Sequence, residues 1–287
     1  MLTREGAVLA QPTLVLRLEH AIVPARDSTV VRTMAEIMTR PCFATLVRVA
    51  LDTRQGRRMR HTQASAEAIQ AYLCDPRCDA VIMDSGRKSE LIAQAFLPTG
   101  LVLEPDYWSA YPAPLELHVF LPHEPVLARM RLDAFLDLAV AVHAIAGCIS
   151  MELGQRLALH LAFGGSSQLP DAVPVQPGMS GRRLAERGRF DKRKLDREVA
   201  SPEWGLFLSR EHLERVPAHE LEASGVFHQV RRLRDDLVFL QLTSDPADAL
   251  RPDYDALLDP VRRVLAPVLS PPTGQLSLTA PPAPDPE

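Results

Sequence analysis

Hydrophobic and polar positions follow two different periods along this chain, and each change of period marks an expected element. Alternating or β-branched apolar residues predict short strands at 13–20, 43–51, 80–83, 115–121, 148–153 and 203–208. Two further apolar runs, 226–232 and 237–243, flank the polar turn Arg234-Asp235-Asp236 and predict a β-hairpin. Short strands are therefore expected over most of the length of the chain.

Apolar side chains at three- and four-residue intervals predict helices between these strands. The first helix follows Asp27 and Ser28, either of which can cap it, and Pro41 stops it. Ser65 and Ser209 are the expected caps of two later helices, because a serine hydroxyl accepts a hydrogen bond from the free N–H groups of a first turn.

Three more segments have helical spacing. Residues 90–97 form a short one, and residues 129–146 form a longer one that Gly147 is expected to end. The strongest helical pattern covers residues 254–268. Within it, Pro260 is expected either to kink the helix or to start a second one.

This order of elements predicts an α+β fold in which largely antiparallel sheets are flanked by helices. Residues 115–153 and 203–243 share a strand–helix–strand pattern, which predicts two loosely similar halves. We expect residues 1–270 to form one domain with an irregular charged loop at 164–200. Residues 271–287 are proline-rich and lack periodicity, so they are expected to be a disordered tail.

Composition narrows the classes of function. The 287 residues are 46% hydrophobic and carry a net charge of −4, which argues against a general nucleic-acid binder. No uninterrupted run of about 18 apolar residues predicts a membrane helix, and the first residues do not resemble a signal peptide. Four cysteines without a disulfide framework indicate a reducing compartment, so a cytoplasmic protein is expected.

Motifs that could carry catalysis or bind metal are weak. Cys74 and Cys78 have neither the redox spacing nor the second ligand pair of a zinc site. The run Gly164-Gly165-Ser166-Ser167 lacks the flanking residues of a phosphate loop or a nucleophile elbow. We therefore predict no catalytic residues, no metal and no cofactor, and a protein that is not an enzyme.

An aromatic cluster is the first candidate partner-binding feature. Tyr107, Trp108 and Tyr111 stand between prolines in a chain that is only 5% aromatic. Tyr and Trp are enriched at interface hot spots because they offer a large contact area with few rotatable bonds. The alternative is that these side chains cover a sheet edge or fill a corner of the core.

A run of aspartates is the second candidate feature. Asp245, Asp248 and Asp253 are the first members of an acidic stretch that continues to residue 259. Such a stretch can steer a basic partner into place and speed association. The alternative is that the carboxylates cap helices and are otherwise solvated.

A tryptophan, Trp204, the predicted hairpin 226–243 and the predicted helix from Tyr254 follow one another in the C-terminal part of the chain. This order resembles the type VI secretion immunity proteins, in which a Trp-led strand, a helix, a hairpin and a Tyr-containing terminal helix occur in succession. Residues 115–122 and 146–150 resemble the middle section of the family, so the resemblance covers the last half to two-thirds of the chain.

The resemblance implies an inhibitor. Members of this family bind a cognate antibacterial toxin and neutralise it by occlusion, without catalysis, and some relatives pair with nuclease-type toxins. Direct contact with nucleic acid or a membrane is not expected. Whether the protein forms a homodimer is left undecided by the sequence. Two other functions also stay open, namely an enzyme whose catalytic residues are dispersed and an adaptor protein of the secretion system.

Overall fold

Strands and helices alternate through the part of the chain that the structure describes. The structure is a computed structural model and describes residues 2–4, 7–10, 12–20, 28–43, 48–52, 60–75, 80–84, 91–96, 115–153 and 197–270. The strands are β1 (Leu2–Arg4), β2 (Ala7–Ala10), β3 (Pro12–His20), β4 (Arg48–Asp52), β5 (Arg60–Gln63), β6 (Ala80–Asp84), β7 (Leu91–Phe96), β8 (Leu115–Pro122), β9 (Ala146–Leu153), β10 (Gly205–Ser209), β11 (Gln229–Arg234) and β12 (Leu237–Gln241). The helices are α1 (Ser28–Met38), α2 (Ala66–Leu73), α3 (Pro125–Ala141), α6 (Arg210–Arg215), α7 (Ala218–Ala223) and α8 (Tyr254–Val264), with 3-10 turns η1 (Pro41–Phe43) and η3 (Pro246–Leu250).

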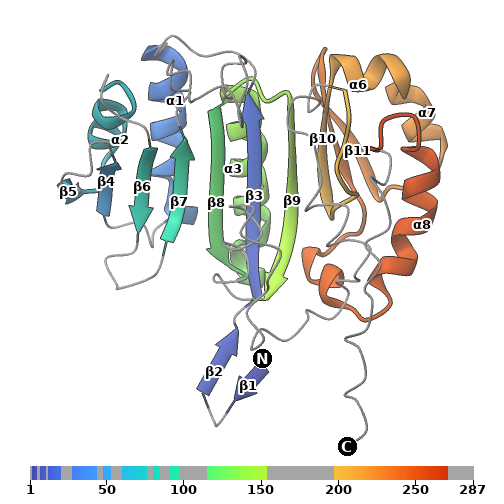
Figure 1. The fold of residues 1–287 in the computed structure, drawn as a ribbon, viewed down its shortest axis with the longest axis horizontal. Coiled ribbons are helices and arrows are strands. Elements are labelled where there is room, and N and C mark those ends of the chain that lie inside the picture. The colour runs from blue at the N-terminus through green and yellow to red at the C-terminus, as the bar shows by residue number, and fades with distance from the viewer. Residues whose placement is uncertain are drawn as a thin grey trace, which may run out of the picture.

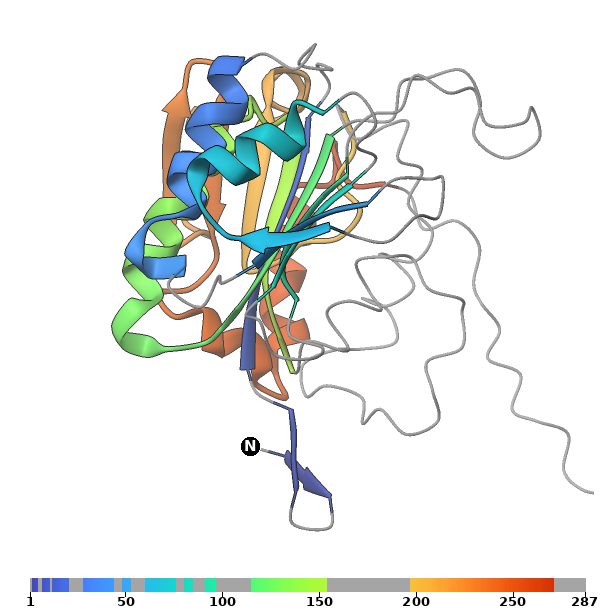
Figure 2. The same ribbon diagram turned by 90° about the vertical axis from the view of Figure 1, so that its left-hand side faces the viewer.

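Ten of these strands form one antiparallel sheet (Figure 1). Their order is β11-β12-β10-β9-β3-β8-β7-β6-β4-β5, and β1 pairs with β2 in a separate ribbon. Helices α1, α2 and α3 lie together on one side of the sheet (Figure 2), while α6, α7 and α8 gather beside β10 to β12. The predicted α+β class with a largely antiparallel sheet is confirmed.

One connection occurs three times in the sheet: a helical segment joins two parallel strands that have a third strand between them. Helix α2 joins β5 to β6 around β4, and α3 joins β8 to β9 around β3. Helices α6 and α7 join β10 to β11 around β12. The predicted likeness of residues 115–153 and 203–243 is therefore a shared split β–α–β topology.

Strands β10 and β12 are buried on both faces. Every residue of β10 and β12 is buried, although successive side chains of a strand point to opposite faces. On one face Phe207 and Phe239 stack with ring centroids 5.1 Å apart, and Trp204 lies 6.5 Å from Phe239. On the other face Leu206 and Leu240 are opposite each other in register, and both are buried. This end of the sheet is consequently the interior of the C-terminal half.

The predicted helix at 90–97 is wrong, because β7 occupies Leu91–Phe96. Six residues are too few for a helix that is stable by itself, since nucleation is costly. Here the segment pairs with β6 on one side and β8 on the other, so both sides of its backbone contribute to sheet hydrogen bonding. Long-range strand pairing outweighs the local preference for a helix.

The predicted ends of the helix at 129–146 are also wrong. Helix α3 begins at Pro125, where the missing N–H of proline costs nothing, and ends at Ala141. The chain then turns at His143, which has a left-handed φ of 52°. Gly147 lies inside β9, where a Cβ atom would come within 2.5 Å of the carbonyl oxygen of Arg17. The glycine thus permits close strand packing and does not end the helix.

The two serine caps are as predicted. Ser65 caps α2 by accepting a hydrogen bond from the N–H of Ala68 at 3.1 Å, and Ser209 occupies the N-cap position of α6. The predicted hairpin is formed by β11 and β12, but β11 covers Gln229–Arg234 and not the predicted 226–232, so the turn is residues 235–236. Helix α8 runs through Pro260 as one helix, so the alternative that a second helix starts there is wrong. No helix in the described ranges is long and apolar enough to cross a bilayer.

Candidate interaction site

Three of the predicted partner-binding residues lie together at the start of the C-terminal helical segment. Asp245 precedes η3, Asp248 lies in its first turn, and Asp253 precedes α8. Leu257, one turn further along α8, has 41% of its surface exposed. We call Asp245, Asp248, Asp253 and Leu257 the η3–α8 surface. The other predicted residues, Tyr107, Trp108 and Tyr111, lie outside the described residues.

Each aspartate of this surface also has a local structural role. Asp245 caps η3, because its Oδ1 accepts a hydrogen bond from the N–H of Ala247 at 2.8 Å. Asp248 places a negative charge at the positive end of the same turn. Asp253 accepts two hydrogen bonds from Arg251, at 3.0 and 2.8 Å, and these lower the pKa of its carboxyl.

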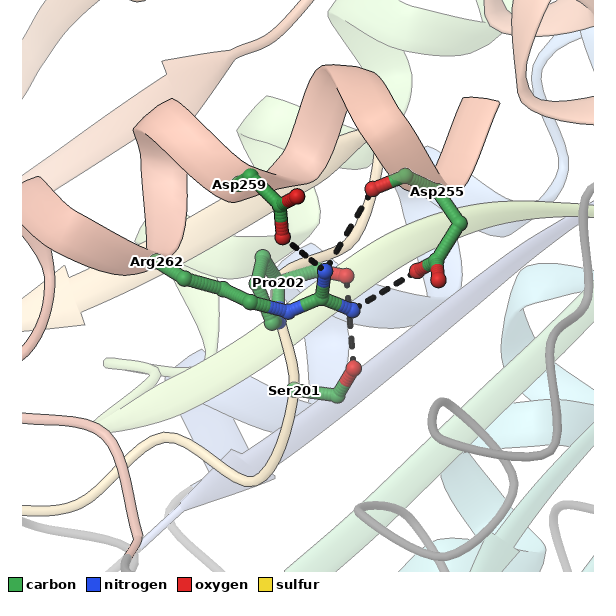
Figure 3. Close-up of polar contacts among 5 residues, drawn as sticks. All are labelled: Ser201, Pro202, Asp255, Asp259 and Arg262. Carbon is green, nitrogen blue, oxygen red and sulfur yellow. Dashed lines mark hydrogen bonds and ion pairs between the residues drawn. The ribbon is translucent and has the colours of Figure 1, made fainter. Parts of the chain in front are cut away.

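The later aspartates of the acidic stretch face an arginine of their own helix (Figure 3). Arg262 is only 6% exposed, and its Nη2 lies 2.7 Å from Asp255 Oδ1. Its Nη1 donates to Asp259 Oδ1 at 3.0 Å and to the carbonyl oxygen of Asp255 at 3.3 Å. Asp255 and Asp259 therefore share one buried guanidinium as an ion-pair partner, and the candidate surface is confined to the earlier aspartates.

A second exposed surface lies where α3 and β11 run side by side. Asp133 on α3 forms an ion pair with Arg231 on β11, at 3.6 Å between Oδ1 and Nη1. Further along, Arg234 Nη1 is 2.7 Å from His143 Nδ1, just beyond the end of α3. Val126 and Met130, at helical spacing on α3, are 91% and 48% exposed. Sequence reasoning missed Val126 because the predicted helix started too late to include it.

The hairpin carries a bidentate ion pair whose effect depends on pH. Arg234 Nη2 donates to Asp236 Oδ1 at 2.6 Å and to Oδ2 at 2.7 Å, and these hydrogen bonds lower the pKa of Asp236 below its ordinary 3.8. A carboxyl whose pKa is lower in the folded state stabilises the fold above the unfolded pKa. That stabilisation is lost as the pH falls through the lowered value.

Asp236→Asn is expected to lower the free energy of unfolding by about 0.5–1 kcal/mol at pH 7, since the pair is partly exposed and screened by solvent. The difference between the two proteins should shrink as the pH falls below about 4. Urea unfolding of both proteins at pH 7 and at pH 3 measures it. A difference of equal size at both pH values would contradict this explanation.

Groups that resemble catalytic residues have structural surroundings. Ser209 Oγ lies 3.1 Å from His212 Nδ1, as in a nucleophile–base pair, but His212 is fully buried and its Nδ1 also accepts from the N–H of Ser209 at 3.3 Å. This is the reciprocal cap of α6, with histidine in place of glutamate. Burial raises the pKa of the Cys42 thiol, which disfavours the reactive thiolate.

Possible metal ligands do not cluster in the described part of the chain. Among those residues, no group of three His, Cys, Asp or Glu side chains could hold a metal ion. Cys42, Cys74 and Cys148 are free thiols, while Cys78 lies outside the described residues. His118 is buried and packs edge-on against Phe120, with ring centroids 6.4 Å apart.

These observations define the class of the protein as an α+β fold with a ten-stranded antiparallel sheet, and the described residues include exposed charged surfaces on η3–α8 and on α3–β11. No known family profile matches the chain. No curated protein matches it significantly. A solved structure with a similar fold is the Pseudomonas aeruginosa T6SS protein PA0821, with a TM-score of 0.53 and 16% sequence identity. That similarity covers 91% of this chain and 77% of the other, and it establishes a likeness of fold.

Proposed function

We propose that this chain is an immunity protein that binds and neutralises a cognate antibacterial toxin of a type VI secretion system, by occluding it and without catalysis. The observation that carries the proposal is the fold shared with a T6SS protein over 91% of the chain. The sequence resemblance to type VI secretion immunity proteins supports it independently, because it rests on the order of motifs along the chain.

The residues that carry the sequence resemblance are determinants of the fold. Trp204 is buried, and its Nε1 donates to Thr243 Oγ1 at 3.1 Å. This hydrogen bond joins the residue before β10 to a residue just after β12. Tyr254 is fully buried at the start of α8. A family that shares such residues shares a scaffold, whereas partner choice is expected to depend on exposed residues that vary.

An inhibitor of a lethal toxin needs high affinity and a rigid surface. Nearly complete neutralisation calls for a Kd in the nanomolar range or below, about −12 kcal/mol or stronger. A stable interface of this kind buries on the order of 1,600 Å² in total. The antiparallel sheet and the helices whose buried apolar side chains share its core supply a rigid support for such an interface.

The η3–α8 surface offers one way to recognise a toxin with a basic cleft, such as a nuclease. The exposed carboxylates of Asp245 and Asp253 and the half-buried one of Asp248 would attract the toxin and raise the association rate. Asp245 is the clearest candidate, because no ion pair to it is found among the described residues. Asp253 contributes less, since Arg251 already neutralises it.

Amide substitutions test this surface without removing its caps. The triple variant Asp245→Asn, Asp248→Asn, Asp253→Asn keeps an acceptor at each position, since asparagine caps turns as well as aspartate does. We expect its association with the toxin to be about tenfold slower at low salt and nearly unchanged at high salt. Stopped-flow association at several salt concentrations measures this. Equal rates and equal salt dependence would exclude the η3–α8 surface from recognition.

The proposed function itself is tested by co-expression. The open reading frame adjacent to this gene is induced in a sensitive bacterium, with and without this protein, and the cells are then lysed for co-purification. The proposal predicts toxicity, rescue and a stable one-to-one or two-to-two complex. Toxicity without rescue or complex would contradict it. Rescue of growth by a protein that forms no complex would favour an enzyme.

A further inference from the structure

We propose that the free edge of β11 is a docking strand for an extended acidic segment of the partner protein, with Met130 and Val126 of α3 flanking it. The proposal rests on the proposed function and specifies where the partner binds. It is independent of the η3–α8 surface, which is expected to meet a basic region of the partner.

The position of β11 in the sheet is the first observation. It is the terminal strand of the ten, and in the described part of the chain its hydrogen-bonded neighbour is β12 alone. A terminal strand presents a row of backbone N–H and C=O groups on its outer side, and an extended chain can add to it as a further strand. Gln229, Arg231 and Arg232 are exposed along this strand.

The charge of the strand selects the kind of occupant. The sequence of β11, Gln-Val-Arg-Arg-Leu-Arg, holds three arginines and no acidic residue. Two copies of this strand would bring arginines close together, which disfavours self-pairing. An acidic strand would instead place carboxylates opposite the arginines. Charged side chains on an edge strand also disfavour pairing with neutral strands. The arginines that protect β11 from aggregation therefore also make it selective for an acidic strand.

Arg232 is the arginine best placed to bind a partner. Arg231 is paired with Asp133 and Arg234 with Asp236. Within the described residues, no ion pair or hydrogen bond of the Arg232 side chain is found, and the residue is exposed. Its guanidinium can therefore bind a carboxylate without giving up an internal contact, which lowers the cost of binding.

The neighbouring helix adds apolar contact area. The Asp133–Arg231 ion pair shows that α3 meets β11 at this point, and Met130 lies one turn before Asp133 on the same side of the helix. Val126 follows one turn further back, and both side chains are largely exposed. An apolar pair beside the terminal strand of the described sheet gives a partner both backbone hydrogen bonds and a hydrophobic contact.

The test uses the full chain and the product of the adjacent toxin gene. Arg232→Glu is expected to weaken the complex at least tenfold, because carboxylates would then face each other. Met130→Ser, which changes no charge, is expected to weaken it by a smaller factor. The control is Arg32→Glu on α1, which lies over the half of the sheet opposite β11 (Figure 1) and makes the same change in charge at an exposed site, where Arg32 faces Glu36 at 4.0 Å.

Hydrogen–deuterium exchange separates strand addition from simple charge attraction. In the wild-type complex, amides of residues 229–234 should exchange at least about tenfold more slowly than in the free protein. A complex in which Arg232→Glu binds like the wild type, or in which β11 amides exchange as in the free protein, would overturn the docking strand and leave the proposed function standing. If the wild-type chain forms no complex, the proposed function fails and the partner assigned to this edge fails with it.

Discussion

Replacing Arg131 by methionine is expected to lower the free energy of unfolding by about 3 kcal/mol, because the side chain is a buried donor to three separate elements. Arg131 lies on α3 and is only 2% exposed. Its Nη2 lies 2.8 Å from Glu124 Oε1, its Nε donates to the carbonyl oxygen of Cys42 at 3.3 Å, and its Nη1 donates to the carbonyl oxygen of Pro122. One guanidinium therefore joins η1, the end of β8 and the start of α3.

The cost comes mainly from the two carbonyl oxygens. Methionine fills a similar volume but donates no hydrogen bond, so these two acceptors would lose the guanidinium as a partner. Glu124 is 48% exposed and can be solvated, so the lost ion pair adds little.

Arg129→Met on the same helix is the matched control. Arg129 is exposed, so this change should stay within about 0.5 kcal/mol. Urea unfolding of both variants measures the difference, and similar midpoints for the two would show that Arg131 does not join these elements.

Replacing Arg262 by methionine is expected to cost about 2–3 kcal/mol. The guanidinium is 6% exposed and lies between the carboxylates of Asp255 and Asp259, which are 29% and 54% exposed (Figure 3). Removing it leaves two carboxylates of like charge near one another, as well as a carbonyl oxygen that has lost a donor. Solvent reaches both carboxylates, which reduces the cost below that of a fully buried pair.

The neighbouring Arg263 supplies the control for this prediction. It is exposed on α8, so Arg263→Met should leave the free energy of unfolding nearly unchanged. Because α8 also carries Leu257 of the η3–α8 surface, loosening the helix should raise proteolysis within residues 254–264 of the Arg262 variant. Equal protease sensitivity of both variants would contradict the role of Arg262 in holding α8.

Local signals in the sequence were sufficient for part of the fold. Serine caps, the polar turn at 235–236 and the alternating strands are set by residues close together in the chain, and they were predicted from those residues. The position of β3 between β8 and β9 depends on pairing across more than a hundred residues, which periodicity does not report. The same limit explains the wrong prediction for β7. Its local sequence is compatible with a helix, and only its pairing with β6 and β8 makes it a strand.

Prediction of the candidate site was more limited. The aspartates were found because they are close together in sequence, but their pairing with Arg251 and Arg262 depends on the turns they adopt. The surface where Asp133 of α3 meets Arg231 of β11 joins residues about a hundred positions apart, so neither segment indicates it alone. One local signal was present, because Val126 and Met130 are one helical turn apart. A predicted helix that started at Pro125 would have placed both on the same side of α3.

The proposal that this protein neutralises a toxin by occlusion is tested most directly by the ratio of the two proteins at which toxicity disappears. The purified product of the adjacent open reading frame is mixed with increasing amounts of this protein. The amount of complex is measured by native mass spectrometry, and residual toxicity is assayed on permeabilised cells. Inhibition by occlusion predicts that toxicity falls in proportion to the complex formed and disappears at one equivalent. Loss of toxicity at a small fraction of one equivalent, without a complex, would contradict the account and indicate that this protein inactivates the toxin by catalysis.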